Sequence, residues 1–325
     1  MSALVLFPAE ELLPAAWRDF PNHGPVRVFN PALLPDGAGW LFAYRVVGPD
    51  GRRRIALCRL DAALRVIAGS PLALTDLVRF RAGHHYAEPA TIWFADPRLY
   101  RLGGQIFIYW NSGWHEPRNH QFVQELDPGD FSPIGFPREL VLRGERQKLE
   151  KNWTLFGDGP FHAIYSVNPH RVLDFSLAGA GEIECTDAVT RSWDTTAYAN
   201  SHGGLRGGAP PQLVDGHYWS FCHAVSGSEG DYRYTPVAYQ FAASRPFAPT
   251  AAPIRPLAFG ETGAPRRRSF PKLNPAVGEV IYPCGAAFRE GRWFVSHGIN
   301  DEQCAIAILS HADVVATVRP VATQG

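Results

Sequence analysis

The sequence has no excess of charge of either sign and no long apolar run. Its 325 residues contain 31 Lys and Arg and 31 Asp and Glu, so the formal net charge is zero at pH 7. A neutral chain has no bulk electrostatic attraction for nucleic acid or anionic lipid, and we expect neither as a partner. No run approaches the roughly 18 apolar residues that a membrane span needs, so we expect none.

Cysteine is scarce and shows no pairing pattern. An odd number of scattered cysteines without CxxC spacing argues against a disulfide scaffold or a zinc site, and we predict reduced thiols and no bound metal. The N-terminus, MSALVLFPAEELLPAAW, has neither a basic region nor a small-residue cleavage site, so the prediction is a cytoplasmic protein. The five cysteines are Cys58, Cys185, Cys222, Cys284 and Cys304.

Glycine, proline and aromatic residues are abundant instead. There are 31 Gly and 28 Pro, and aromatic residues make up 12% of the chain. This mixture favours many short strands joined by turns over long helices. The chain is therefore expected to be all-β.

One pattern recurs five times along the chain: a strand-like run, a Gly-containing turn and an aromatic-rich strand. Gly turns between such runs are strong hairpin signals. The copies are VRVFNPALLPDGAGWLFAYRV, ADPRLYRLGGQIFIYWN, EKNWTLFGDGPFHAIYSV, GGAPPQLVDGHYWSFCHA and YPCGAAFREGRWFVSHG. The turns are Asp36-Gly37, Gly103-Gly104, Asp158-Gly159, Asp215-Gly216 and Glu290-Gly291.

The repeat length indicates the architecture. The copies recur about every 55 to 75 residues, which fits a four-stranded propeller blade with generous loops. We therefore predict a single five-bladed β-propeller over residues 1–325, in which the first 25 or so residues form a cap or a dimer contact. The Pro- and Ala-rich stretch 247–275 is interpreted as an extended connection between blades.

Counting back from each turn identifies a ring of equivalent positions. If the blades are equivalent, these positions lie at equal height and meet at one mouth of the central channel. Most are small or polar, which indicates a lined pocket, and Asp96 is the only carboxylate among them. The positions are Asn30, Asp96, Asn152 and Cys284, seven residues before the turn Gly, and Gly208, eight before it.

These repeats resemble the five-bladed propeller glycosidases, most closely the mannoside phosphorylases and hydrolases of glycoside hydrolase family 130. The resemblance covers roughly residues 25 to 310. The motifs that carry it are FNP with YRV, ADPRLYRLGGQIFIYW, EKNWTLF with YSVNPHRVL, GGAPPQLVDGHYWSFCHA and CGAAFREGRWFVSHGINDEQCAIAIL.

The resemblance implies a role for individual positions. The family's Asp-Pro-Arg motif holds its general acid, which corresponds to Asp96, and Arg98 would orient sugar or phosphate oxygens. Arg45 corresponds to an arginine that faces the pocket, Lys151 to a lysine near the anion site, and Asp301 to an acid that contacts sugar hydroxyls. Further substrate contacts are expected from Asn30, Asn111, Asn152, Tyr165, His170, Arg206 and His223.

The chemistry leaves several activities open. Inverting cleavage needs an acid and a nucleophile on the opposite face of the sugar. A phosphorylase uses inorganic phosphate as co-substrate and requires no other cofactor, whereas a hydrolase needs a base, for which Glu88, Glu150 or Asp301 are candidates.

The third copy departs from the phosphorylase pattern, because Ser166 stands near the place of an arginine. Related propellers that share EKNW and YSVNPH transfer mannose from activated donors, so a glycosyltransferase is an alternative. A non-catalytic sugar-binding propeller is another. Either way the expected partner is a small-molecule or oligosaccharide substrate, with a homo-oligomer left open. Trp110 and Trp114 follow a strand end and are candidates for stacking on a sugar.

Overall fold

The computed structural model describes residues 3–20, 24–113, 119–147, 150–260 and 268–321. These residues form mostly β-strands, as expected, and within them no helix has the length and apolar run needed to cross a bilayer. The helices of the described residues are α1 (Ala9–Leu12), α2 (Glu88–Ile92), α3 (Thr196–His202) and α4 (His311–Val315), with 3-10 turns η1 (Ala15–Trp17) and η2 (Leu74–Asp76).

The strands form successive antiparallel groups, because each tight turn reverses the chain beside the preceding strand. The first group is β2 (Arg27–Asp36), β3 (Gly39–Val47) and β4 (Arg53–Leu60). The second is β5 (Ala95–Leu102), β6 (Gln105–Asn111), β7 (Gln121–Leu126) and β8 (Pro133–Leu142). The third is β9 (Thr154–Phe156), β10 (Phe161–Ser166), β11 (His170–Phe175) and β12 (Ile183–Arg191).

The remaining strands belong to two further antiparallel groups. In one, β13 (Gly204–Arg206) and β14 (Gln212–Val214) both pair with β15 (His217–Ser226), followed by β16 (Tyr232–Ala242) and β17 (Pro249–Pro253). The other contains β18 (Val277–Arg289), β19 (Arg292–Ile299) and β20 (Gln303–Ser310). Two parallel pairings, β8 with β12 and β16 with β18, join neighbouring groups.

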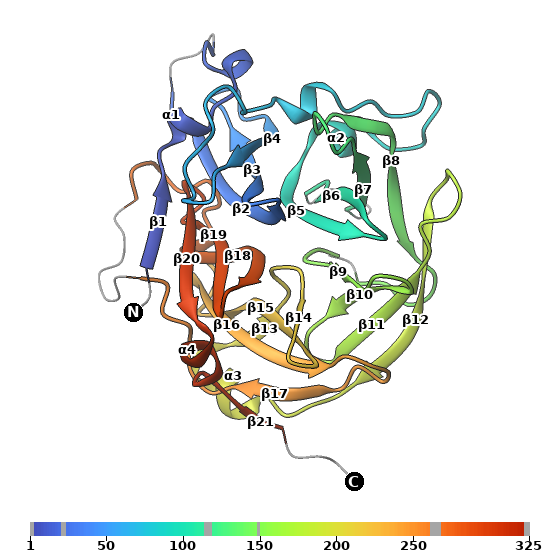
Figure 1. The fold of residues 1–325 in the computed structure, drawn as a ribbon, viewed down its shortest axis with the longest axis vertical. Coiled ribbons are helices and arrows are strands. Elements are labelled where there is room, and N and C mark those ends of the chain that lie inside the picture. Colours follow the sequence, from blue (N-terminus) through green and yellow to red (C-terminus); the bar gives the residue numbers. More distant parts are fainter. Residues whose placement is uncertain (1–2, 21–23, 114–118, 148–149, 261–267, 322–325) are drawn as a thin grey trace.

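The groups follow one another around a ring in chain order, as the view down the shortest axis shows (Figure 1). The strands that begin the groups lie innermost: β2 contacts both β5 and β18, and β14 contacts β18. The arrangement is propeller-like. It brings segments far apart in sequence to one central region.

Both ends of the chain complete groups that are formed elsewhere in the sequence. Strand β1 (Ala3–Phe7) pairs antiparallel with β20, and β21 (Val318–Pro320) pairs with β17. Residues 3–7, part of the segment expected to act as a cap or a dimer contact, are thus the outer strand beside β20.

The predicted turns lie between the predicted strands. Asp215-Gly216 and Glu290-Gly291 are two-residue connections in which both residues have positive φ: 50° and 77° in the first, 51° and 71° in the second. Turns with this conformation match the twist of the flanking strands, and they require residues that tolerate the left-handed region. The Gly positions therefore determined where the chain reverses.

The core lies between the groups and contains large aromatic side chains. Trp40, Trp153, Trp219 and Trp293 are among the largest fully buried side chains. Trp110 is also buried, packed on Phe94 and Phe122, so the expectation that it stacks on a sugar is wrong. Trp114 lies outside the described residues.

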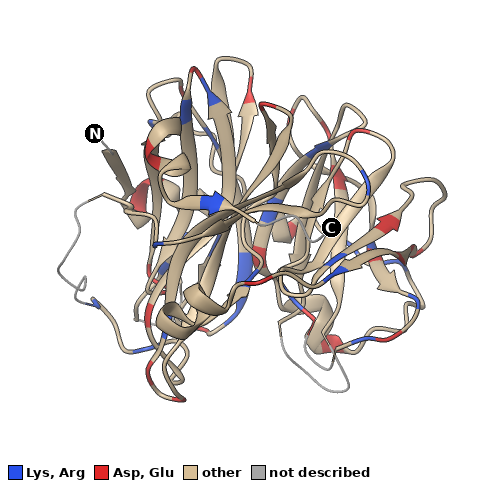
Figure 2. Cartoon of the chain, turned by 90° about the horizontal axis from the view of Figure 1, so that it is seen from below, with Lys and Arg blue, Asp and Glu red and all other residues tan. Residues whose placement is uncertain are grey.

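In the view of Figure 2, the positions of Lys and Arg and those of Asp and Glu are interspersed along the described part of the chain. All five cysteines are buried and free.

Candidate functional site

Three of the equivalent positions counted from the turns have an unusual backbone. Asn30, Asp96 and Asn152 have φ values of 52°, 52° and 66°. Asn and Asp tolerate this left-handed conformation better than other residues with a Cβ. Strand pairing slips in register across Asn30 and across Asp96, so each marks a β-bulge that redirects its side chain.

These three side chains line one cavity of about 360 Å³, as the counting argument predicted. The other two positions do not line it. Cys284 is fully buried, and Gly208 is packed so closely that an added Cβ would lie 2.5 Å from the carbonyl oxygen of Phe221. The predicted site residues that line the cavity are Asn30, Arg45, Asp96, Asn111, Lys151, Asn152, His223 and Asp301.

Asp96 lies at the centre of a polar network. Its Oδ1 accepts a hydrogen bond of 2.8 Å from Nδ2 of Asn30 and lies 3.4 Å from Nη1 of Arg45. Burial raises the pKa of the carboxyl, but Arg45, Arg98 and the Asn30 hydrogen bond lower it. The lowering prevails, so the pKa of Asp96 lies below its ordinary value and its ionised form is favoured.

Asp301 is the second carboxylate of the cavity, and its environment acts in the opposite direction. It lies in the tight turn between β19 and β20, where Asn300 and Asp301 have φ values of 56° and 58°. Burial and the neighbouring charge of Asp96 raise the pKa of Asp301, and the cations around it do not offset this. Two carboxylates with pKa values moved apart are typical of acid–base sites.

Cationic side chains outnumber carboxylates in the cavity lining. Arg45, Arg53 and Lys151 line it, against the two carboxylates Asp96 and Asp301. Burial lowers the pKa of Lys151, and Asp96 and Asp301 oppose this effect. This composition favours positive charge in the cavity and suits an anion.

Arg98 does not reach the cavity, which corrects the expectation that it orients sugar or phosphate oxygens. It is completely buried, and its nitrogens donate to Gly208 O at 2.6 Å, Asp96 O at 3.1 Å and Tyr282 Oη at 2.7 Å. Tyr282 in turn donates to Oδ1 of Asn152 at 2.6 Å. Arg98 thus ties the backbone of Asp96 to β18 and to the segment between β13 and β14.

Neutral side chains complete the wall. His223 is buried, with its ring stacked on Tyr234 at 4.8 Å, and burial lowers its pKa to about 3. The Oδ1 of Asn111 accepts from the backbone N–H of Gly113 at 2.9 Å, which fixes the turn after β6.

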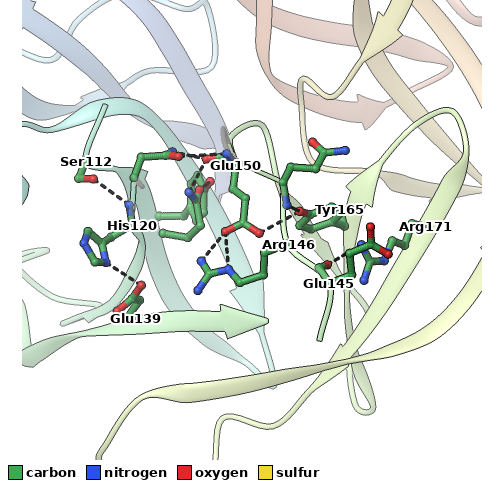
Figure 3. Close-up of polar contacts among 12 residues, drawn as sticks. Ser112, His120, Glu139, Glu145, Arg146, Glu150, Tyr165 and Arg171 are labelled. Atoms are coloured by element: carbon green, nitrogen blue, oxygen red, sulfur yellow. Dashed lines mark hydrogen bonds and ion pairs between the residues drawn. The ribbon is translucent and has the colours of Figure 1, made fainter. Parts of the chain in front are cut away.

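A buried network holds the segment that carries Lys151 and Asn152 (Figure 3). The side chain of Glu150 is fully buried, its Oε1 accepts from Tyr165 Oη at 2.8 Å, and its Oε2 accepts from Arg146 Nε at 2.9 Å. Tyr165 therefore positions Glu150 and does not line the cavity, contrary to its expected substrate contact.

The same contacts exclude Glu150 as the catalytic base, because both of its carboxylate oxygens are already bound within the protein. Glu88 is exposed on α2 and does not line the cavity either. Of the predicted candidates for a base, Asp301 is the one in the cavity.

Two further predicted contacts lie elsewhere. His170 is completely buried against Tyr239 and Phe241, with ring centroids 5.8 and 5.1 Å away, and burial lowers its pKa to about 4. It is a core residue and does not contact substrate. Arg206 is exposed at the end of β13, opposite His223, and does not line the cavity.

The sequence reasoning missed two parts of the wall. Trp93 and Arg53 line the cavity, and the guanidinium of Arg53 lies 4.2 Å from the centre of the Trp93 ring. Leu273, Asn274 and Pro275 line it as well, although the stretch that contains them was interpreted as a connection. An available signal for Trp93 was its place three residues before Asp96.

One cluster of possible metal ligands occurs in the described part of the chain. The ligand atoms of His85, Glu139 and Glu182 lie within 4.8 Å of one another. None of the three lines the cavity.

Comparison with known proteins shows the fold. No protein-family model matches the chain, and no curated protein matches it in sequence. The structure is similar to the β-1,2-mannobiose phosphorylase from Listeria innocua, with a TM-score of 0.64, 12% identity and coverage of 97% of this chain and 98% of that one.

Two other solved structures are similar. A glycosyl hydrolase from Bacteroides ovatus has a TM-score of 0.57 at 14% identity, with 90% of this chain and 85% of that chain covered. The mannose phosphorylase MPT-4 from Leishmania mexicana, in complex with phosphate, has a TM-score of 0.54 at 12% identity, with 91% and 87% covered. The chain therefore shares the fold of the family 130 mannoside phosphorylases.

Proposed function

We propose that this protein is a carbohydrate-active enzyme that cleaves a β-mannosidic glycoside with inversion, with Asp96 as the general acid. The observation that carries the proposal is the position of Asp96. It lies in a polar cavity, held by Asn30 and Arg45, at a bulge of an inner strand. The fold shared with mannoside phosphorylases and glycosidases supports the substrate class.

The proposal includes the architecture predicted from the repeats. Each antiparallel group of strands corresponds to one blade, and β1 supplies the outer strand of the last blade beside β20. Five blades around one axis account for the convergence of Asn30, Asp96 and Asn152 on one cavity.

Phosphate is the nucleophile that the charges favour. Arg45 and Lys151 line the cavity beside Asp96, and a bound phosphate would satisfy both cations. By offsetting them, phosphate would also raise the pKa of Asp96 and allow it to keep the proton it must donate. A hydrolase would instead depend on Asp301 as base, a role that its raised pKa suits because it makes the carboxylate a stronger proton acceptor.

The third strand group does not weaken this proposal. Ser166 stands where the resemblance would place an arginine, and its hydroxyl donates to Pro169 O at 2.6 Å outside the cavity. Arg45 and Lys151 remain as cations of the cavity beside Asp96.

The test is an activity assay on a panel of β-mannosides with and without inorganic phosphate. We expect cleavage that depends on phosphate and releases mannose 1-phosphate. Asp96→Asn should reduce the rate by about 10²-fold or more, since general acids contribute on this scale. Asp61→Asn, which alters an exposed carboxylate paired with Arg65, is the matched control.

Three outcomes would contradict parts of the proposal. Phosphate-independent cleavage would assign a hydrolase, and mannose transfer only from a nucleotide-activated donor would assign a transferase. Glycan binding without turnover, unchanged in Asp96→Asn, would mean a sugar-binding protein.

A further inference from the structure

Three consecutive arginines stand at the start of β4, Arg52 just before it and Arg53 and Arg54 within it, and the middle one differs from its neighbours. Arg54 pairs with Asp50 at 2.5 Å, and Arg52 lies 4.0 Å from the same carboxylate. Within the described residues, Arg53 forms no ion pair, and its Nε is buried without a hydrogen-bond partner. It lines the cavity, and its Nη1 donates to the carbonyl oxygen of Gly51.

The guanidinium of Arg53 is held in place by an aromatic ring. It lies 4.2 Å from the centre of the Trp93 ring, and the two residues form a parallel β-bridge. The backbone N–H of Phe94 donates to Arg53 O at 3.4 Å. A stacked, anchored arginine loses little side-chain entropy when it binds a ligand.

Gly113 fixes the position of the ring. A Cβ at Gly113 would lie 2.1 Å from Nε1 of Trp93, so only glycine allows the indole to lie against this turn. Among the described residues, Nε1 of Trp93 has no hydrogen-bond partner, like Nε of Arg53, and both atoms are buried. Both residues line the cavity, so a ligand bound there would contact this pair.

The ligand should carry negative charge. Burial and the nearby charges of Arg45 and Arg27 lower the pKa of Arg53, so three arginines repel one another here. Asp96, a carboxylate of the same cavity, already contacts Arg45. An anion placed against Arg53 would relieve this repulsion.

The proposed function assigns this anion to the leaving group, because it places phosphate against Arg45 and Lys151. Trp93, Arg53 and Asp96 are all half-buried and line the same cavity. An anion held by Arg53 would therefore be a second one, carried by the other part of the substrate.

We propose that Trp93 and Arg53 form a leaving-group subsite that selects a sugar bearing an acid, either a carboxylate or a phosphate ester. The indole stacks on the sugar ring, and the guanidinium binds the anion in a bidentate manner. This inference rests on the proposed function, since it names the leaving group of that reaction.

Equilibrium binding tests the proposal without requiring turnover. Isothermal titration calorimetry on the full chain would compare D-glucuronate, D-glucose 6-phosphate, neutral D-glucose and inorganic phosphate. We expect one or both acidic sugars to bind about tenfold or more tightly than glucose, as a charge-assisted pair provides. Which of them binds better distinguishes a carboxylate from a phosphate ester.

Substitutions locate the effect. Arg53→Gln should abolish the preference for acidic sugars, whereas Arg52→Gln, its exposed neighbour, should leave it unchanged. Arg53→Lys keeps the charge but not the bidentate geometry, and it should retain part of the preference. Trp93→Ala should weaken the binding of acidic and neutral sugars alike. Unchanged melting temperatures would confirm that the variants are folded.

Three results would overturn the proposal. Equal affinity for glucose and both acids means that no anion is selected, and a preference that survives Arg53→Gln means that Arg53 does not select it. Loss of inorganic phosphate binding in Arg53→Gln, with acidic sugars unaffected, would place Arg53 in the nucleophile site. Failure of the proposed function appears separately, as absent cleavage despite intact binding of acidic sugars.

Discussion

The two carboxylates of the cavity show how position alone divides identical groups. Asp96 lies against Arg45 and above Arg98, so its ionised form is favoured. Asp301 is buried, and the charge of Asp96 also disfavours its ionised form; the surrounding cations do not offset these two effects. Opposite pKa shifts in one cavity therefore come from neighbours and not from the residue type.

This difference predicts opposite pH dependences of stability. The folded-state pKa of Asp96 is depressed, so its contribution is present above the unfolded value of about 3.9 and lost as pH falls through the folded pKa. The folded-state pKa of Asp301 is raised, so its contribution is present below the unfolded value and lost as pH rises through the folded pKa. Asp96→Asn should therefore be more destabilising at pH 7 than at pH 4. Asp301→Asn should be less destabilising at pH 7 than at pH 4.

Thermal unfolding of the two variants and the wild-type chain at pH 4, 5.5 and 7 checks this. The informative quantity is the difference in melting temperature from wild type at each pH. The two differences should change in opposite directions between pH 4 and pH 7. A change in the same direction for both would contradict the assignment of charge in the cavity.

At this scale the sequence allowed some of the residues that line the cavity to be predicted, but not all of them. Asn30, Asp96 and Asn152 were found because spacing from a turn is a local property. Arg53 and Trp93 were missed because a stacked pair forms only when two distant segments meet. Arg98 was misassigned because sequence does not tell whether an arginine's donors are already used inside the protein.

Among the elements, the turns were the most predictable, because a positive φ restricts residue type. Gly291 has φ of 71°, and an added Cβ would meet nothing within 4 Å. Glycine is therefore needed here for its backbone conformation, and not because a side chain would collide with neighbouring atoms. By contrast, β13 and β14 both pair with β15, a division that no pattern in the sequence indicated.

Gly291→Ala should consequently destabilise the fold by about 1–2 kcal/mol, the cost of a left-handed residue with a Cβ. The matched control is Gly181→Ala, where an added Cβ also meets nothing within 4 Å but φ is not in the left-handed range. This control should be neutral or slightly stabilising. Chemical denaturation measures both, and equal effects would show that the φ of Gly291 does not constrain the turn.

At the level of the whole molecule, the ring depends on strands from the two ends of the chain. The repeats allowed the groups to be predicted, but not that β1 would complete the last of them, because five residues without a turn carry no repeat signal. Phe7 of β1 is 3% exposed and packs on Phe42 of the first group, with ring centroids 4.8 Å apart. Strand β1 thus connects the last group to the first.

Removal of residues 1–8 should therefore lower the melting temperature by several degrees. It deletes the β1–β20 ladder and a buried Phe, and loss of such a side chain alone costs about 3–5 kcal/mol. It also leaves the edge of β20 unpaired, so we expect self-association on size-exclusion chromatography. Removal of residues 322–325, which lie beyond β21, is the control. If the first truncation melts and elutes like the control, the ring does not need β1 for closure, and stability resides within each group of strands.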